Sequence, residues 1–236
     1  AFLTILSLPL WVGLIMIVSR KQTAPGATPL LFILTGALIW TGANTLHLLY
    51  IPLDLKLFWA NCQYFGILVL PAAWLVFALE YTGYEKYITK ESVLLLAIEP
   101  VVVLGAVWTN PIHGWFRSNI ALQTINEYSY LVETFGIAFW VHTLYSYCLL
   151  TAGTVLILYA IYQTQAVYRH QATALTVAVA IPWGANILKL VSNLPFANTF
   201  LPIALIGTGL VFTYATLEYE LLDTPPIPRT LTRNML

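Results

Sequence analysis

The sequence predicts an all-α fold: a polytopic membrane protein that forms a seven-transmembrane helix bundle, with an extracellular loop cap between helices 4 and 5. Composition is the first reason. The 236 residues are 59% hydrophobic and 8% charged, whereas soluble domains carry about 25% charged residues. The apolar residues also form long continuous runs, each near the about 20 residues that a helix needs to cross a bilayer. Their continuity argues against a β-barrel, in which polar and apolar residues alternate.

Short polar or proline-containing segments separate the apolar runs. The expected spans are Ala1–Ser19, Pro29–Leu49, Lys56–Tyr81, Val93–Thr109, Phe139–Tyr162, Ala172–Leu194 and Thr199–Tyr219. No basic segment precedes the first run, so it is interpreted as a membrane helix rather than a signal peptide. Because the chain opens without a methionine and ends at "RTLTRNML", we expect it to be part of a longer protein.

The basic residues of the connections predict the orientation, because cytoplasmic loops carry an excess of Lys and Arg. With an external N-terminus, the cytoplasmic side holds Arg20, Lys21, Lys86, Lys90, Arg169, Arg229 and Arg233. The external side then holds Lys56, Arg117 and Lys189. We therefore expect a multi-pass cell-membrane protein with its N-terminus outside and its C-terminus in the cytoplasm. The formal net charge is zero, which gives no electrostatic reason to expect nucleic-acid binding.

The longest connection, residues 110–138, follows the outer end of the fourth span. It opens with "NPIHGWF" and is rich in aromatic residues. Loops longer than about 12–15 residues are usually functional or disordered. We expect this one to fold over the helix ends as a cap, with a strand pair around "ALQTINEYSYLVE". Trp108 and Trp115 can equally belong to the aromatic belt of the interface.

Polar side chains at membrane depth are costly unless they face the bundle interior, and here they gather in the outer halves of the spans. Asn44 and His47 lie three residues apart on one helix face. The predicted ligand-binding residues are Asn44, His47, Tyr64, Glu99, Asn110, His113, His142, Tyr145, Asn186 and Lys189. This asymmetry predicts a polar pocket that opens to the outside or is covered from it.

These residues also have interpretations that require no ligand. Lys189 can extend to the interface, and the histidines can bond a backbone carbonyl. Asparagines often join membrane helices through hydrogen bonds. Glu99 lies near mid-membrane, where burial disfavours its ionised form. We expect it to be protonated or paired, with Lys189, His47 and His142 as candidate partners, and a functional or pH-sensing role is its other interpretation.

Prolines and glycines predict where the bundle can bend. The expected signal-relay residues are Pro182, Pro202, Gly207, Gly209, Pro225 and Pro226. A proline removes one backbone donor and can kink a helix. The "TPPIP" segment predicts a stiff, extended connection. We therefore expect a transmembrane sensor domain over residues 1–222 and a Pro-rich linker over residues 223–236.

Several motifs are shared with a known family. They are "LFWANCQYFGILVLPAAWLVFALEYTG" in the third span, "TNPIHGWF" after the fourth, "GIAFWVHTLYSY" opening the fifth, and "RHQ" with "IPWGAN" around the sixth. Together they resemble the seven-transmembrane N-terminal sensor region of membrane histidine kinases over nearly the whole chain. The chain departs from that family at Asn198, where relatives carry an acidic residue, so a ligand contact through that charge is not expected here.

The resemblance implies a sensor or receptor domain that detects a ligand or membrane stimulus in its outer half. It implies a relay through the seventh helix to a missing cytoplasmic PAS or kinase module, which would pass a phosphoryl group to a response regulator. It also implies a homodimer in the lipid bilayer. No catalytic residue and no cofactor is expected in this segment. The ligand, a small molecule or a lipid, stays open, and a cyclase could replace the kinase.

Other seven-helix functions fit the sequence less well. A light-driven rhodopsin would need a lysine midway along the last helix, and the last predicted span has none. A transporter would be expected to contain inverted repeats, which the sequence does not show clearly. A metalloenzyme would need closely spaced ligands such as His-Glu-x-x-His, so no metal site is expected. A transporter or membrane enzyme with a polar intramembrane pocket stays the alternative.

Overall fold

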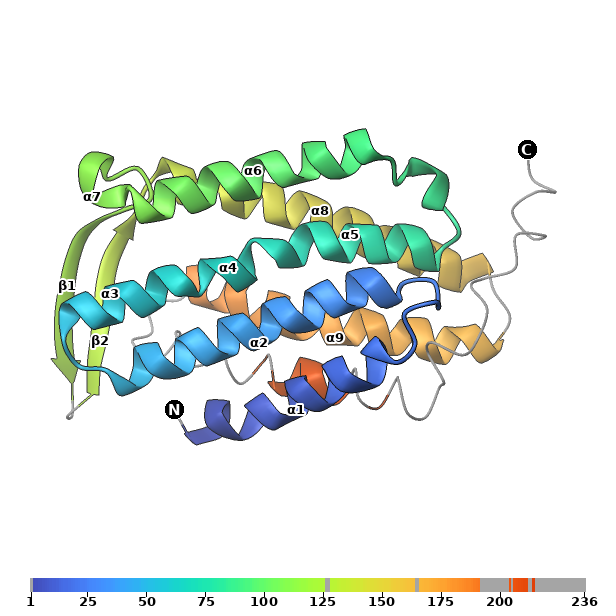
Figure 1. Cartoon of the computed structure of the whole chain (residues 1–236), viewed down its shortest axis with the longest axis horizontal. Helices are drawn as coiled ribbons and strands as arrows, with labels where there is room; N and C mark the ends of the chain where they lie inside the picture. The colour runs from blue at the N-terminus through green and yellow to red at the C-terminus, as the bar shows by residue number, and fades with distance from the viewer. Residues whose placement is uncertain are drawn as a thin grey trace.

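The computed structural model describes residues 2–125, 128–163, 166–191, 204, 206–211 and 214; of Lys189 it describes the backbone alone. Five helical segments in these ranges are long and apolar enough to cross a membrane. They are α1 (Phe2–Ser19), α2 (Ala27–Leu49), an interrupted helix over Leu53–Tyr81, α6 (Lys90–Trp108) and most of α8 (Ile137–Gln163). With α9 (Ala166–Val191), they form a polytopic membrane helical bundle (Figure 1).

The first five predicted spans agree with these helices to within three residues at each end. The sixth was expected to begin at Ala172, but α9 begins at Ala166, so "YRHQ" is helical rather than a connection. No proline or glycine interrupts that segment, and a helix needs no outside partner for its backbone. The predicted seventh span is described, as helix, only at residues 204, 206–211 and 214. Several expected features lie outside the described residues: Asn198, Pro202, Pro225, Pro226 and the linker over 223–236.

The third span, predicted as one helix, is interrupted twice. It consists of α3 (Leu53–Cys62), α4 (Tyr64–Ile67) and α5 (Val69–Tyr81). The second interruption, at Leu68, lies three residues before Pro71, whose ring and missing N–H disturb the preceding turn of a helix. The first lies at Gln63, whose side-chain oxygen accepts a hydrogen bond from Trp40 Nε1 of α2 at 3.2 Å. At the first interruption, the Gln63 side chain therefore bonds α2.

Glycines bring α2 and α4 into backbone contact. A Cβ atom on Gly66 would overlap the carbonyl oxygen of Gly36 and lie 2.8 Å from the backbone nitrogen of Trp40. Small residues allow membrane helices to approach this closely. Around the crossing, α5 packs against both α2 and α8. The main hydrophobic core there includes Trp11 and Trp74.

A two-stranded sheet joins α6 to α8. Its strands, β1 (Arg117–Ile125) and β2 (Tyr128–Phe135), are antiparallel, with Arg117 opposite Phe135. The strand pair expected in this connection is therefore present. Figure 1 shows it across the end of the bundle where α2 ends and α3 begins, whereas the α1–α2 and α5–α6 connections lie at the opposite end.

Pro100 inside α6 creates a bond to α8. Proline has no N–H, so the carbonyl oxygen of Leu96, four residues earlier, loses its partner within the helix. The hydroxyl of Tyr145 in α8 donates to this oxygen at 2.8 Å. Otherwise α6 exposes much of its apolar surface, including Leu94 and Val101, as a lipid-facing helix does.

Pro182 creates a similar bond between α9 and residue 208 of the last predicted span. It frees the carbonyl oxygen of Ala178, again four residues earlier. The hydroxyl of Thr208 donates to that oxygen at 2.7 Å. The neighbouring Gly209 packs closely on α1, since a Cβ there would lie 2.8 Å from Leu10 Cδ2. The described part of the last span is therefore joined to both α9 and α1.

Candidate functional site

A cavity of about 300 Å³ lies inside the bundle, and part of its wall is β2 of the hairpin. The rest of the wall comes from Arg117 of β1, from α1 to α5, α8 and α9, and from Thr208. Apolar and aromatic side chains dominate it, among them Trp40, Trp74 and Phe139. A mainly apolar cavity with few polar groups is typical of a small-molecule site.

Five of the ten predicted ligand-binding residues line this cavity: Asn44, His47, Tyr64, His142 and Asn186. Pro182, expected in the relay, also lines it. The other described candidates, Glu99, Asn110, His113 and Tyr145, lie outside the lining. The sequence analysis missed several polar lining residues, of which Lys56, Gln63, Arg117, Glu133 and Ser146 are the main examples.

His142 connects the cavity to Glu99 on α6. Its Nδ1 lies 3.0 Å from Glu99 Oε1, and its Nε2 lies 3.2 Å from Ser146 Oγ. Glu99 is therefore paired, with one of the three partners expected for it. Its other oxygen, Oε2, is buried and has no hydrogen-bond partner within the described ranges. Glu99 therefore contacts the cavity lining through His142.

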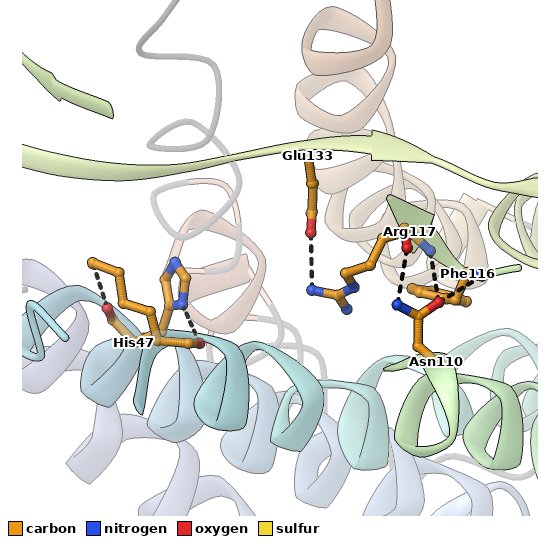
Figure 2. Close-up of polar contacts among 6 residues, drawn as sticks. His47, Asn110, Phe116, Arg117 and Glu133 are labelled. Atoms are coloured by element: carbon orange, nitrogen blue, oxygen red, sulfur yellow. Dashed lines mark hydrogen bonds and ion pairs between the residues drawn. The ribbon is translucent and has the colours of Figure 1, made fainter. Parts of the chain in front are cut away.

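Asn110 shapes the turn that leads into the hairpin. Its Nδ2 donates to Arg117 O at 2.9 Å. Its Oδ1 accepts from the backbone N–H groups of Phe116 and Arg117, at 2.9 and 3.0 Å (Figure 2). Phe116 is fully buried, so these backbone groups need a partner inside the protein. Asn110 was predicted to bind a ligand, but its amide group instead bonds backbone groups of this turn.

His113, in the short helix α7 (Asn110–His113), supports the same turn. Its Nδ1 accepts a hydrogen bond from the N–H of Trp115 at 2.9 Å. In a neutral ring the other nitrogen, Nε2, then carries the proton, and it lies 3.0 Å from Thr109 Oγ1. The "TNPIHGWF" motif thus places Phe116 and Arg117, rather than lining the cavity itself.

Arg117 is the residue that this turn delivers to the cavity. It is 3% exposed, and its Nη1 donates to Glu133 Oε2 of β2 at 2.9 Å. Figure 2 shows Glu133 pointing from the strand toward the guanidinium group. The rings of Tyr64 and Phe116 lie 5.7 and 5.2 Å from the Arg117 Cζ atom, within cation–π range. The sequence analysis had treated Arg117 only as an external loop charge.

Lys56 also turns inward, although it was expected at the external side of the membrane. It is 2% exposed, and its Nζ donates to His47 O at 2.8 Å. In return, His47 Nδ1 lies 3.0 Å from Lys56 O, and it must carry a proton there because a carbonyl oxygen only accepts. This reciprocal pair fixes the turn between α2 and α3.

Comparison with protein families identifies the family of this chain. The family described as the N-terminal 7TM region of histidine kinase matches residues 3–226. The chain belongs to this family. A comparison with curated proteins found no match. As the 7TM region of a membrane histidine kinase, the domain has a sensor role in two-component signal transduction.

The described part of this 7TM region offers binding groups and no metal site. Within it, no three side chains of His, Cys, Asp or Glu are grouped so that they could hold a metal ion. The amide of Asn186 on α9 donates to Tyr147 OH at 3.0 Å, which ties α9 to α8 across the cavity wall. Chemically, the arrangement can bind a small molecule between the hairpin and the helices.

Proposed function

We propose that this 7TM region detects a ligand in the cavity beside the hairpin and relays its occupancy through the last helix to a cytoplasmic kinase. One observation carries the proposal: the same cavity wall contains Arg117 and Glu133 from the hairpin connection and Thr208 from the last helix. A molecule held there touches the cap and the output segment together. Of the predicted ligand-binding residues, five line the cavity, and Glu99 and Asn110 bond residues of that lining.

The proposal places the hairpin outside the cell, as an extracellular cap. Its support is the distribution of basic residues. Arg20, Lys21, Lys86 and Lys90 belong to the end of the bundle opposite the hairpin. Lys56 and Arg117, at the hairpin end, are buried and bonded within the protein. The N-terminus is then external and the C-terminus cytoplasmic.

The relay in this proposal runs from α9 to the last helix. Thr208 Oγ1 lies 2.7 Å from Ala178 O and 3.1 Å from Ala204 O of its own helix. Thr208 can therefore bond either helix by a small rotation. Gly209 is tightly packed on α1, whereas a Cβ on Gly207 would still lie 3.6 Å from Ile181. The helix is therefore packed less tightly on α9 at Gly207 than on α1 at Gly209.

Beyond the described residues, the proposal extends to the rest of the signalling protein. Residues 1–222 form the sensor domain, and residues 223–236 form a stiff linker that leads to a PAS or kinase module. Pro202, Pro225 and Pro226 contribute to this output segment. The kinase acts as a homodimer and phosphorylates a response regulator.

Filling the cavity tests the sensing role. Ala37 lines the cavity, and Ala37→Leu in the full-length kinase is expected to change basal autophosphorylation in membrane vesicles by about fivefold or more, since couplings between sites are typically about 1–3 kcal/mol. Ala97→Leu, the same change on the exposed surface of α6, is the control and is expected to leave the rate within about twofold, as surface changes usually do. Equal rates for wild type and both variants, at equal amounts of folded protein, would exclude sensing through the cavity.

Removing the Thr208 hydroxyl tests the relay. Thr208→Val keeps the shape but leaves Ala178 O without its donor, whereas Thr208→Ser keeps the donor. In the Thr208→Val background, Ala37→Leu is expected to lose most of its effect on autophosphorylation, because the cavity and the last helix are uncoupled. In the Thr208→Ser background the effect is expected to persist. An unchanged Ala37→Leu effect in both backgrounds would show that the signal takes another route.

A further inference from the structure

The unpaired polar atoms around the cavity indicate what its occupant must offer. Six buried side-chain atoms in the described ranges have no hydrogen-bond partner, and five belong to residues that line the cavity. These five are Trp11 Nε1, Thr41 Oγ1, Asn44 Nδ2, Arg117 Nε and Trp183 Nε1. All except the threonine hydroxyl can only donate. These atoms are themselves inaccessible in this structure, so an occupant bonds them only after a side-chain rearrangement, and it must then supply acceptor atoms, since a buried donor without an acceptor is costly.

The charges around the cavity favour an anion. The charged residues in its described lining are Lys56, Arg117 and Glu133. Glu133 pairs with Arg117 through one guanidinium nitrogen, whereas Lys56 bonds a neutral carbonyl oxygen and pairs with no carboxylate among the residues described. Among the described residues, one buried positive charge therefore has no counter-charge, which is unfavourable unless a partner supplies it. An ammonium ligand would add to this imbalance.

The rest of the cavity wall is apolar, which favours an anion that also has an apolar part. Leu70, Trp74 and Leu150 are among its many apolar side chains. Its volume of about 300 Å³ lies at the lower end of the range for organic ligands. We propose that the cavity binds a small amphiphilic anion, with an oxygen-rich acidic headgroup near Arg117 and Lys56 and an apolar tail among the aromatic side chains. This inference rests on the proposed sensing role of the cavity.

Matched probes that share one tail test the headgroup. Octanoate, octan-1-ol and octylamine are titrated into the 7TM region in phosphatidylcholine nanodiscs, with empty nanodiscs as the background for partitioning. Tryptophan fluorescence reports binding, since Trp40, Trp74 and Trp183 line the cavity. Octanoate is expected to bind about tenfold more tightly than the alcohol or the amine, because charge-assisted hydrogen bonds are the stronger kind. Equal or tighter binding of octylamine or octanol would overturn the proposal.

Variants of the ion pair assign the preference to Arg117. In Arg117→Gln/Glu133→Gln, which removes the pair without leaving a lone buried charge, octanoate is expected to lose about tenfold in affinity. Octanol binding, which needs only the apolar wall, is expected to persist and so reports that the cavity is intact. Glu133→Gln alone is expected to tighten octanoate binding, because Arg117 loses its competing carboxylate. Lys86→Gln, at an exposed lysine at the other end of the bundle, is the control for removal of a charge remote from the cavity, and it is expected to leave octanoate affinity unchanged. Unchanged octanoate affinity in the double variant would refute the assignment.

The headgroup could belong to a free acid or to a membrane lipid. Repeating the octanoate and octan-1-ol titrations in phosphatidylglycerol nanodiscs distinguishes them: weaker binding of both probes identifies an anionic lipid as the occupant, whereas unchanged octanol binding identifies a free organic acid, since the anionic surface repels only octanoate. Failure of this inference leaves the sensing role testable, because Ala37→Leu blocks any occupant. Loss of octanoate preference with a retained Ala37→Leu effect means that the ligand class is wrong. If Ala37→Leu leaves autophosphorylation unchanged, the cavity has no sensing role.

Discussion

Gly66→Ala is expected to lower the free energy of unfolding by about 3 kcal/mol, the upper part of the usual range for overpacking. The added methyl group meets the carbonyl oxygen of Gly36 and the backbone nitrogen of Trp40. Backbone atoms cannot rotate away as a flexible side chain can, so α2 and α4 must separate. That separation also disturbs Gln63 and Tyr64, which line the cavity beside this crossing. Reversible unfolding of the 7TM region in mixed micelles, followed by tryptophan fluorescence, measures the effect.

Gly105→Ala is the matched control for this substitution. Gly105 also lies inside a membrane helix, but a Cβ there has no neighbour within 4 Å. Alanine is favoured over glycine in a helix interior by about 1 kcal/mol, so this variant is expected to be unchanged or slightly more stable. If the two alanine variants unfolded alike, the close crossing of α2 and α4 would not be a feature of the folded protein.

Asn110→Ala is expected to destabilise the turn into the hairpin by about 3 kcal/mol. It leaves two buried N–H groups and one carbonyl oxygen without partners, and each such group costs about 1–3 kcal/mol. Because the turn positions Arg117, the loss reaches the cavity as well. Hydrogen exchange at Phe116 and Arg117 measures it locally, and thermal unfolding measures it globally.

Asn110→Asp gives a graded comparison. Aspartate can still accept from the N–H groups of Phe116 and Arg117, but it cannot donate to Arg117 O, so an intermediate effect is expected. Thr124→Ala removes an exposed side chain of the same hairpin and is expected to change stability by less than about 0.5 kcal/mol. A loss as small for Asn110→Ala as for Thr124→Ala would contradict the role given to Asn110.

The membrane helices were predictable because length and apolarity alone determine them. The interruptions of the third span were not, although Pro71 was visible in the sequence. A proline shows where a helix can be disturbed, but the crossing of Gly66 with Gly36 depends on two segments thirty residues apart. The pairing of Glu99 with His142 was one of three combinations that burial alone could not separate.

Arg117 and Lys56 show most clearly why much of the cavity wall escaped prediction. Basic residues near the ends of membrane helices ordinarily face water, and nothing in their neighbours along the chain indicates otherwise. Their inward direction depends on acceptors supplied by the fold, Glu133 on the second strand and the carbonyl oxygen of His47. Conversely, Asn110 and His113 are polar residues of the kind expected to contact a ligand, but their side chains bond nearby backbone groups instead.

The bond between Thr208 and the oxygen released by Pro182 has a consequence for how information can leave the bundle. A single hydroxyl aimed at a single exposed oxygen favours one alignment of the two helices, since a slide by one helical turn, about 5.4 Å along the axis, carries the donor out of reach. In the proposed relay, the last helix would therefore occupy either the alignment that makes this bond or one that lacks it. A receptor that reports in two states needs no more than this difference.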